Sequence, residues 1–171
     1  MNFSKEEDLK KVFVSEISKR LQCIKIQTEV RGFHGKPDVV IGFENHTSFD
    51  IVAFELKLKN WSQALTQAFR YYSFASLSYV VLDDAGLGDI NRLIDEFQKY
   101  NVGLLTIDEF GNLNVYHHPK KITPFSLQSR KKMWNLLSET VNWNRSILNL
   151  NSFKRSFNNP SMQDTSELMY I

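Results

Sequence analysis

"KPDVVIGFENHTSFDIVAFELKLKNW", residues 36–61, holds two apolar segments joined by the polar loop "NHTS". Their alternation and their β-branched and aromatic residues predict two strands, over 37–44 and 49–59. Three charged residues, Asp38, Glu55 and Lys57, interrupt these strands. Charges are costly near a core, which leaves two alternatives. Either these charges cover the wet face of a sheet, or they hold a metal ion and a reactive water.

The rest of the chain predicts helices and strands in alternation. Hydrophobic spacing of about 3.6 residues and turn residues predict helices over 4–21, 61–77, 86–100 and 127–150. Further strands are predicted over 23–30, 78–84, 101–108 and 111–118. Helices covering a mixed sheet make an α/β sandwich the expected fold class. We expect one domain over residues 1–150, followed by a polar tail or partner-dependent arm over 151–171.

Composition indicates an ordinary globular protein. The 171 residues are 42% hydrophobic and 23% charged, enough for one domain with a sizeable core. The single cysteine, Cys23, excludes an internal disulfide and suits a reducing compartment. The charged N-terminus does not resemble a signal peptide, and no apolar run is long enough to span a membrane. We therefore expect a cytoplasmic protein.

The three charges can meet at one place in a hairpin. Alternate side chains of a strand share a face, so Glu55 and Lys57 are neighbours about 6–7 Å apart. The chain reverses between the two strands, which brings Asp38 beside the Glu55 end. Two carboxylates suit a hard cation such as Mg²⁺, and a lysine beside them can orient a water or stabilise a phosphate. Gln67 and Tyr71, spaced i,i+4 on the next helix, could brace the lysine or touch a backbone phosphate. The alternatives are a core aromatic for Tyr71 and a solvated polar residue for Gln67.

Three short motifs in this order resemble a known family. They are "PD" at Pro37–Asp38, "ELK" at Glu55–Lys57 and "QAFRY" at Gln67–Tyr71. Over residues 4–83 the chain resembles the PD-(D/E)xK nuclease superfamily, whose restriction-endonuclease-like core is helix, three strands, helix, strand. The resemblance implies a metal-dependent DNA endonuclease that hydrolyses phosphodiester bonds with Mg²⁺, for which Mn²⁺ can substitute. The catalytic residues that it implies are Asp38, Glu55, Lys57, Gln67 and Tyr71, with the metal on Asp38 and Glu55.

Many members of this superfamily add an acid from the first helix. Glu6 is our choice, because it lies at the rim of the helix's apolar stripe. Glu16 on the same stripe is the second candidate, and Glu7 points away. The alternative for all three is solvation or favourable interaction with the helix dipole.

Basic residues offer candidate DNA contacts in two places. Arg31 and His34 lie in the turn before Pro37. The region 117–155 carries eight basic residues and one acid, whereas 83–109 carries seven acids and two basic residues. The candidate phosphate contacts in the basic region are Lys120, Lys121, Arg130, Lys131 and Lys132. Trp134 and Trp143 could stack on bases or pack in the core, and solvated faces remain the alternative for the charges.

Two other readings stay open from the sequence. One is a non-catalytic DNA-binding or assembly module on the same fold. The other is an α/β protein whose acids and lysine lie on its surface. For a nuclease, a duplex has two strands and one site cuts one of them, so a homodimer is expected.

Overall fold

The protein is an α/β structure built on one six-stranded mixed sheet. The computed structural model describes residues 2–21, 25–30, 35–44, 48–139, 154–155 and 157. The strands are β1 (Lys25–Thr28), β2 (Val39–Glu44), β3 (Phe49–Lys57), β4 (Leu77–Asp83), β5 (Gly103–Ile107) and β6 (Leu113–His117). The helices are α1 (Glu6–Arg20), α2 (Trp61–Arg70), α3 (Ile90–Lys99) and α4 (Leu127–Ser138), with short 3₁₀ helices at Tyr71–Ser73 and Asp84–Gly86.

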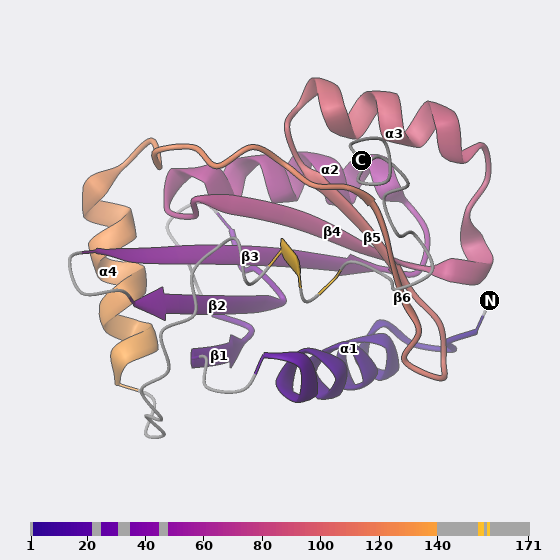
Figure 1. Cartoon of the computed structure of the whole chain (residues 1–171), viewed down its shortest axis with the longest axis horizontal. Coiled ribbons are helices and arrows are strands. Elements are labelled where there is room, and N and C mark those ends of the chain that lie inside the picture. Colours follow the sequence, from indigo (N-terminus) through magenta and orange to yellow (C-terminus); the bar gives the residue numbers. More distant parts are fainter. Residues whose placement is uncertain are drawn as a thin grey trace, which may run out of the picture.

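The strands lie in the sheet in the same order as in the chain, from β1 to β6. The first three form an antiparallel meander, β3, β4 and β5 run parallel, and β6 returns antiparallel to β5. A parallel pair needs a crossover connection, and α2 and α3 supply the two that this sheet requires (Figure 1). The expected α/β class is therefore confirmed.

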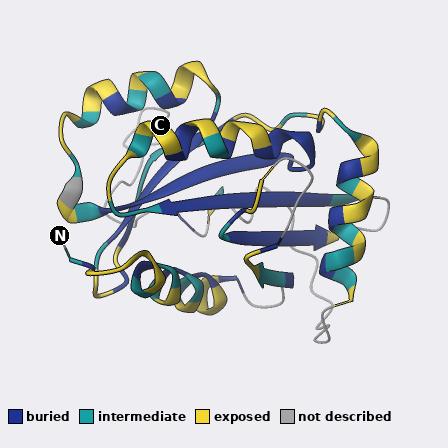
Figure 2. Ribbon diagram, turned by 180° about the vertical axis from the view of Figure 1, so that it is seen from behind, coloured by how far each residue is buried: buried dark blue, intermediate teal, exposed yellow. Residues whose placement is uncertain are grey.

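Both faces of the sheet are covered. α1 lies on one face, where Phe13 packs edge-on against Phe54 of β3 with ring centroids 5.1 Å apart. α2, α3 and α4 cover the other face, where Ala64 and Ala68 of α2 belong to the same cluster as Ala53 of β3. Figure 2 shows the strands buried between helices whose outer sides are exposed. None of the helices within the described residues is both long and apolar enough to cross a membrane.

The second predicted helix is shorter than the sequence suggested. The prediction was 61–77, but α2 ends at Arg70 and one 3₁₀ turn follows it. The apolar residues after Arg70 pack against the sheet instead of continuing the helix. The N–H of Ser76 donates to the carbonyl of Ile51 in β3 at 2.8 Å. That contact leads the chain directly into β4, which cannot start while the helix continues.

The third helix starts later than its predicted bound of 86. Asp89 is the N-cap, because its side chain accepts from the N–H groups of Asn91 and Arg92 at 3.1 and 3.3 Å. Asn101, in the left-handed conformation with φ 57°, follows the end of the helix. The cap chemistry therefore sets both ends of α3.

The remaining predictions hold with ends that are trimmed or shifted by a few residues. The predicted strands over 101–108 and 111–118 are shorter at both ends, and β1 ends at Thr28, two residues before its predicted bound. α4 begins at Leu127 as predicted, with the Ser126 hydroxyl accepting from the N–H of Ser129. Residues 140–150 of that predicted helix, Cys23 and most of the predicted tail lie outside the described residues.

Candidate active site

Two hydrogen bonds to β3, one from the Asp38 backbone and one to its side chain, hold Asp38 where β2 begins and β3 ends. The N–H of Asp38 donates to the carbonyl of Phe54 at 3.1 Å. Asp38 Oδ2 in turn accepts from the N–H of Leu56 at 2.8 Å. Val39 lies opposite Phe54 in the antiparallel pair, so the register continued by one residue sets Asp38 opposite Glu55. The structure thus brings these two acids together, as the hairpin geometry predicts.

Glu55 is a buried carboxylate. It is 2% exposed and shares its side of β3 with Ile51 and Ala53, under α2. The hydroxyl of Tyr71, itself 1% exposed, donates to Glu55 Oε2. The alternative in which these charges cover a wet sheet face is therefore wrong for Glu55. Small residues such as Ala68 on the inner side of α2 let the helix pack close to this face.

Lys57 lies between two carboxylates. Its Nζ is 3.5 Å from Glu55 Oε1 and 3.1 Å from Glu6 Oε2. The Lys57 side chain is 18% exposed and that of Glu6 is 50% exposed. Lys57 ends β3 and Glu6 begins α1, so the cluster forms where the sheet end meets the first helix. Of the acids considered in the first helix, Glu6 is the one that reaches it.

The cluster holds more negative charge than its one ammonium group balances. Burial raises the pKa of Glu55 to about 7, and the charge of Asp38 adds to this against the opposing effects of Tyr71 and Lys57. Burial also raises the pKa of Asp38. Burial lowers the pKa of Lys57, but its bond to Glu6 and the nearby carboxylates outweigh this, so the net pKa is raised. Lys57 therefore stays charged, while Glu55 titrates near neutrality.

Gln67 lies on α2 one turn before Tyr71 and is half-buried. Its Oε1 is buried and has no hydrogen-bond partner among the described residues. A buried acceptor without a partner is costly. The amide is therefore suited to binding a water or another polar group.

The other two α1 acids that the sequence analysis considered do not reach the cluster. Glu16 is ten residues beyond Glu6, which is about 15 Å along a helix, and its Oε1 pairs with Lys19 at 2.6 Å. Glu7 pairs with Lys10 at 2.9 Å. Glu16 is therefore removed as a metal-ligand candidate, and Glu7 stays outside, as expected.

Two of the predicted phosphate contacts have structural partners instead. Lys121 pairs with buried Asp50 at 2.8 Å. Arg130 donates to the carbonyl of Phe49 and stacks on its ring, 4.5 Å from the centroid. Phe49 is six residues from Glu55 along β3, or about 20 Å, and α4 lies at that far end of the sheet (Figure 1). The remaining three candidates, Lys120, Lys131 and Lys132, are exposed.

The other nucleic-acid candidates divide in a similar way. Arg31 and His34 lie outside the described residues. Trp134 stacks on Phe49 with ring centroids 4.5 Å apart, so it packs against the sheet rather than presenting a free face. Trp143 lies outside the described residues.

The sequence analysis missed Glu29. Its N–H donates to the carbonyl of Asp38 at 3.0 Å, and its carboxylate pairs with Lys10 of α1 at 2.6 Å and with Lys36 at 2.5 Å. Glu29 has φ 55°, a left-handed conformation that is uncommon outside glycine. It thus links the end of β1 to α1 and to the turn before Asp38. No residue pattern in the predicted strand 23–30 signals this bend.

The carboxylate pair suits a hard divalent cation. Across the described part of the chain, no three His, Cys, Asp or Glu side chains gather into a metal-binding group. Asp38 and Glu55 supply oxygen donors only, the set that Mg²⁺ uses when it keeps several waters. Burial is the main cause of the raised pKa of Glu55, and the nearby charge of Lys57 does not offset it. A divalent cation at the pair would add positive charge there, so the residues present fit the metal.

A comparison of the chain with protein-family models and with curated proteins found no match.

Proposed function

We propose that this protein is a metal-dependent DNA endonuclease of the PD-(D/E)xK superfamily, with the restriction-endonuclease-like fold. One observation carries the proposal. Asp38, Glu55, Lys57 and Tyr71, which the resemblance names as functional, converge at one end of the sheet. The order helix, three strands, helix, strand over α1 to β4 supports it as well.

Asp38 and Glu55 would hold Mg²⁺ or Mn²⁺, whereas Glu6 pairs with Lys57 at 3.1 Å and, among the described residues, does not complete a group of three acids. When bound, the cation supplies positive charge that favours ionised water and a polarised phosphate. The contacts from Leu56 and Tyr71 fix the orientation of the two carboxylates. The protein therefore holds the site in place before any ligand arrives.

Lys57 would act closest to the reacting phosphate. Its ammonium group can donate to the attacking water and to the phosphate oxygens, which gain charge as the reaction proceeds. In the hydrolysis the attacking water gives one proton to solvent and its oxygen forms a bond to phosphorus. The bond from phosphorus to the leaving oxygen breaks, and that oxygen takes a proton from solvent. The amide of Gln67 is suited to binding the DNA backbone beside this position.

The exposed lysines around α4 would provide a second contact with DNA. Lys131 and Lys132 are on α4, which packs on Phe49, about 20 Å from Glu55 along β3. Contacts of lysine with phosphate give affinity that is largely independent of sequence and falls as salt rises. This contact would place the duplex across the face of the molecule without choosing a sequence.

Cleavage assays test the proposal directly. The purified protein is incubated with plasmid, linear duplex, single-stranded and branched DNA, with Mg²⁺ or Mn²⁺ and then with EDTA. We expect cutting of at least one substrate with either metal and none in EDTA. Lys57→Ala should abolish cutting. Lys59→Ala, which changes an exposed lysine two residues further on, should not.

The same assays separate the proposal from its alternative. A non-catalytic DNA-binding module would bind one or more of these substrates and cut none of them. Binding that is unchanged in Asp38→Asn, Glu55→Gln and Lys57→Ala, with no cleavage by the wild type, would reject the nuclease.

A further inference from the structure

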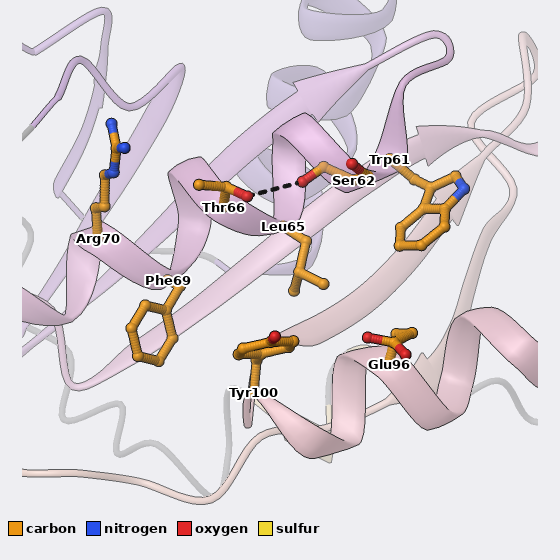
Figure 3. A pocket seen from close by; sticks show the side chains of 8 residues that line it. All are labelled: Trp61, Ser62, Leu65, Thr66, Phe69, Arg70, Glu96 and Tyr100. Carbon is orange, nitrogen blue, oxygen red and sulfur yellow. Dashed lines mark hydrogen bonds between the residues drawn. The ribbon is translucent and has the colours of Figure 1, made fainter.

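A groove lined by aromatic side chains lies between α2 and α3. Its volume is about 340 Å³, a size typical of pockets that bind small ligands. Figure 3 shows Trp61 and Glu96 across from each other at one end of the groove, with Phe69 and Tyr100 toward the other end. Trp61 is half-buried, and Phe69 is 40% exposed. Both rings therefore keep surface on which a flat ligand can stack.

The groove starts close to the candidate active site. Lys57 ends β3 and Trp61 begins α2 four residues later, so their Cα atoms are at most about 14 Å apart. From Trp61 to Phe69 the groove follows α2 for eight residues, or about 12 Å. The Phe69 ring then meets that of Phe125, 6.5 Å away and two residues before α4. An aromatic path thus leads from Lys57 toward the basic helix α4.

Charges of both signs border the groove. Arg70, the last residue of α2, belongs to the lining, and Figure 3 shows its side chain pointing away from α3. Lys99 Nζ lies 5.4 Å from the centre of the Tyr100 ring. Both basic residues lie toward the end away from Trp61, where Glu96 is the acid of the lining. Phosphates suit the basic end, whereas a carboxylate repels phosphate but accepts a hydrogen bond from the amino group of a base.

We propose that this groove holds unpaired bases of the DNA strand that the candidate active site cuts. This role rests on the proposed function and narrows its substrate to DNA that is single-stranded beside the cut, including branched DNA. Aromatic side chains stack on unpaired bases, whereas the bases of a duplex are already stacked on one another. Trp61 and Phe69 would each stack on a base, and Arg70 and Lys99 would contact the backbone.

Fluorescence anisotropy in EDTA, where no strand is cut, measures the binding step. The probes are a labelled single-stranded oligonucleotide and the same sequence as a duplex. We expect the single strand to bind more tightly, and Phe69→Ala to weaken that binding about ten-fold or more while duplex binding stays unchanged. Phe110→Ala is the matched control, because Phe110 is 80% exposed but lies in the turn between β5 and β6.

Arg70→Gln tests the backbone contact. It should weaken binding of the single strand and reduce the dependence of that binding on salt, as the loss of a phosphate contact does. Binding with an unchanged salt dependence would contradict the placement of the backbone at the basic end of the groove.

Cleavage with Mg²⁺ tests the link to the active site. Phe69→Ala should slow the cutting of single-stranded and branched DNA and leave the cutting of duplex unchanged, which a variant that unfolds could not do. A wild type that cuts nothing but keeps its preference for the single strand would reject the nuclease and retain base binding by the groove. Equal binding of single strand and duplex, or equal losses in Phe69→Ala and Phe110→Ala, would overturn the groove's role whatever the cleavage assays show.

Discussion

Replacing Glu55 with Gln measures the electrostatic strain in the candidate active site. Without a cation, burial raises the pKa of Glu55 from 4.5 to about 7. The folded protein then binds this proton more tightly than the unfolded chain does. The contribution of Glu55 to the free energy of unfolding is therefore full below about pH 4.5 and is lost as the pH rises through about 7. At about 1.4 kcal/mol per pH unit, the loss reaches roughly 3 kcal/mol.

Gln has nearly the same shape as Glu and stays neutral at every pH. Its side-chain oxygen can still accept from the hydroxyl of Tyr71, although the ion pair with Lys57 is lost. In EDTA at about pH 8, Glu55→Gln should therefore unfold with a free energy up to about 3 kcal/mol higher than the wild type. At about pH 4.5 the two should agree to within about 1 kcal/mol, because Glu55 is then protonated in the native state.

Urea denaturation followed by tryptophan fluorescence across this pH range measures the difference. Glu96→Gln is the matched control, because it makes the same chemical change at a half-exposed acid and should show no such pH-dependent gain. Saturating Mg²⁺ should narrow the gap at about pH 8, since a cation favours the charged carboxylate. A wild type that is equally or more stable than Glu55→Gln at about pH 8, or a difference that does not change with pH, would refute the reasoning.

Two further substitutions test the hydrogen bond to Glu55 and the packing around β5. Tyr71→Phe removes the hydrogen bond that lowers the pKa of Glu55, so the pH at which stability falls should move upward; a downward movement in the same urea series would contradict this. Gly103→Ala would place a Cβ 2.0 Å from buried Tyr79, and we expect thermal or urea unfolding to show a loss of about 1–3 kcal/mol. Gly88→Ala, whose Cβ would meet nothing within 4 Å, is its control, and equal losses in the two variants would refute the packing argument.

The convergence of Asp38 and Glu55 could be predicted because it depends on local rules. Strand alternation and the reversal of a short hairpin fix which ends of β2 and β3 meet, and both are visible in residues 36–61. The element order followed from the same kind of pattern. These features need no knowledge of how distant segments pack.

The burial of Glu55 could not be predicted from its strand alone. It depends on α2 packing on that side of β3, and the alternation of residues 51–59 is equally compatible with an open face. The small residues Ala64 and Ala68 on α2 were the available signal that a helix packs closely there. Their spacing of four residues could have favoured a covered sheet.

The position of α4 was beyond the reach of sequence patterns. Its basic residues suggested a DNA contact, but the residue pattern of 117–155 does not indicate where that helix packs. Arg130 and Trp134 settle its place by stacking on Phe49, at the far end of β3 from the carboxylates. Such contacts between segments some 80 residues apart depend on the whole fold, as does the left-handed bend at Glu29.

The agreement between sheet order and chain order bears on how the molecule assembles. Each strand pairs with the one synthesised just before it, so every ladder closes over a short stretch of backbone. Low contact order of this kind favours rapid folding. Growth of the sheet strand by strand would join the two acids at the β2–β3 step, and the hydroxyl of Tyr71 would arrive with the helix that leads to the fourth strand.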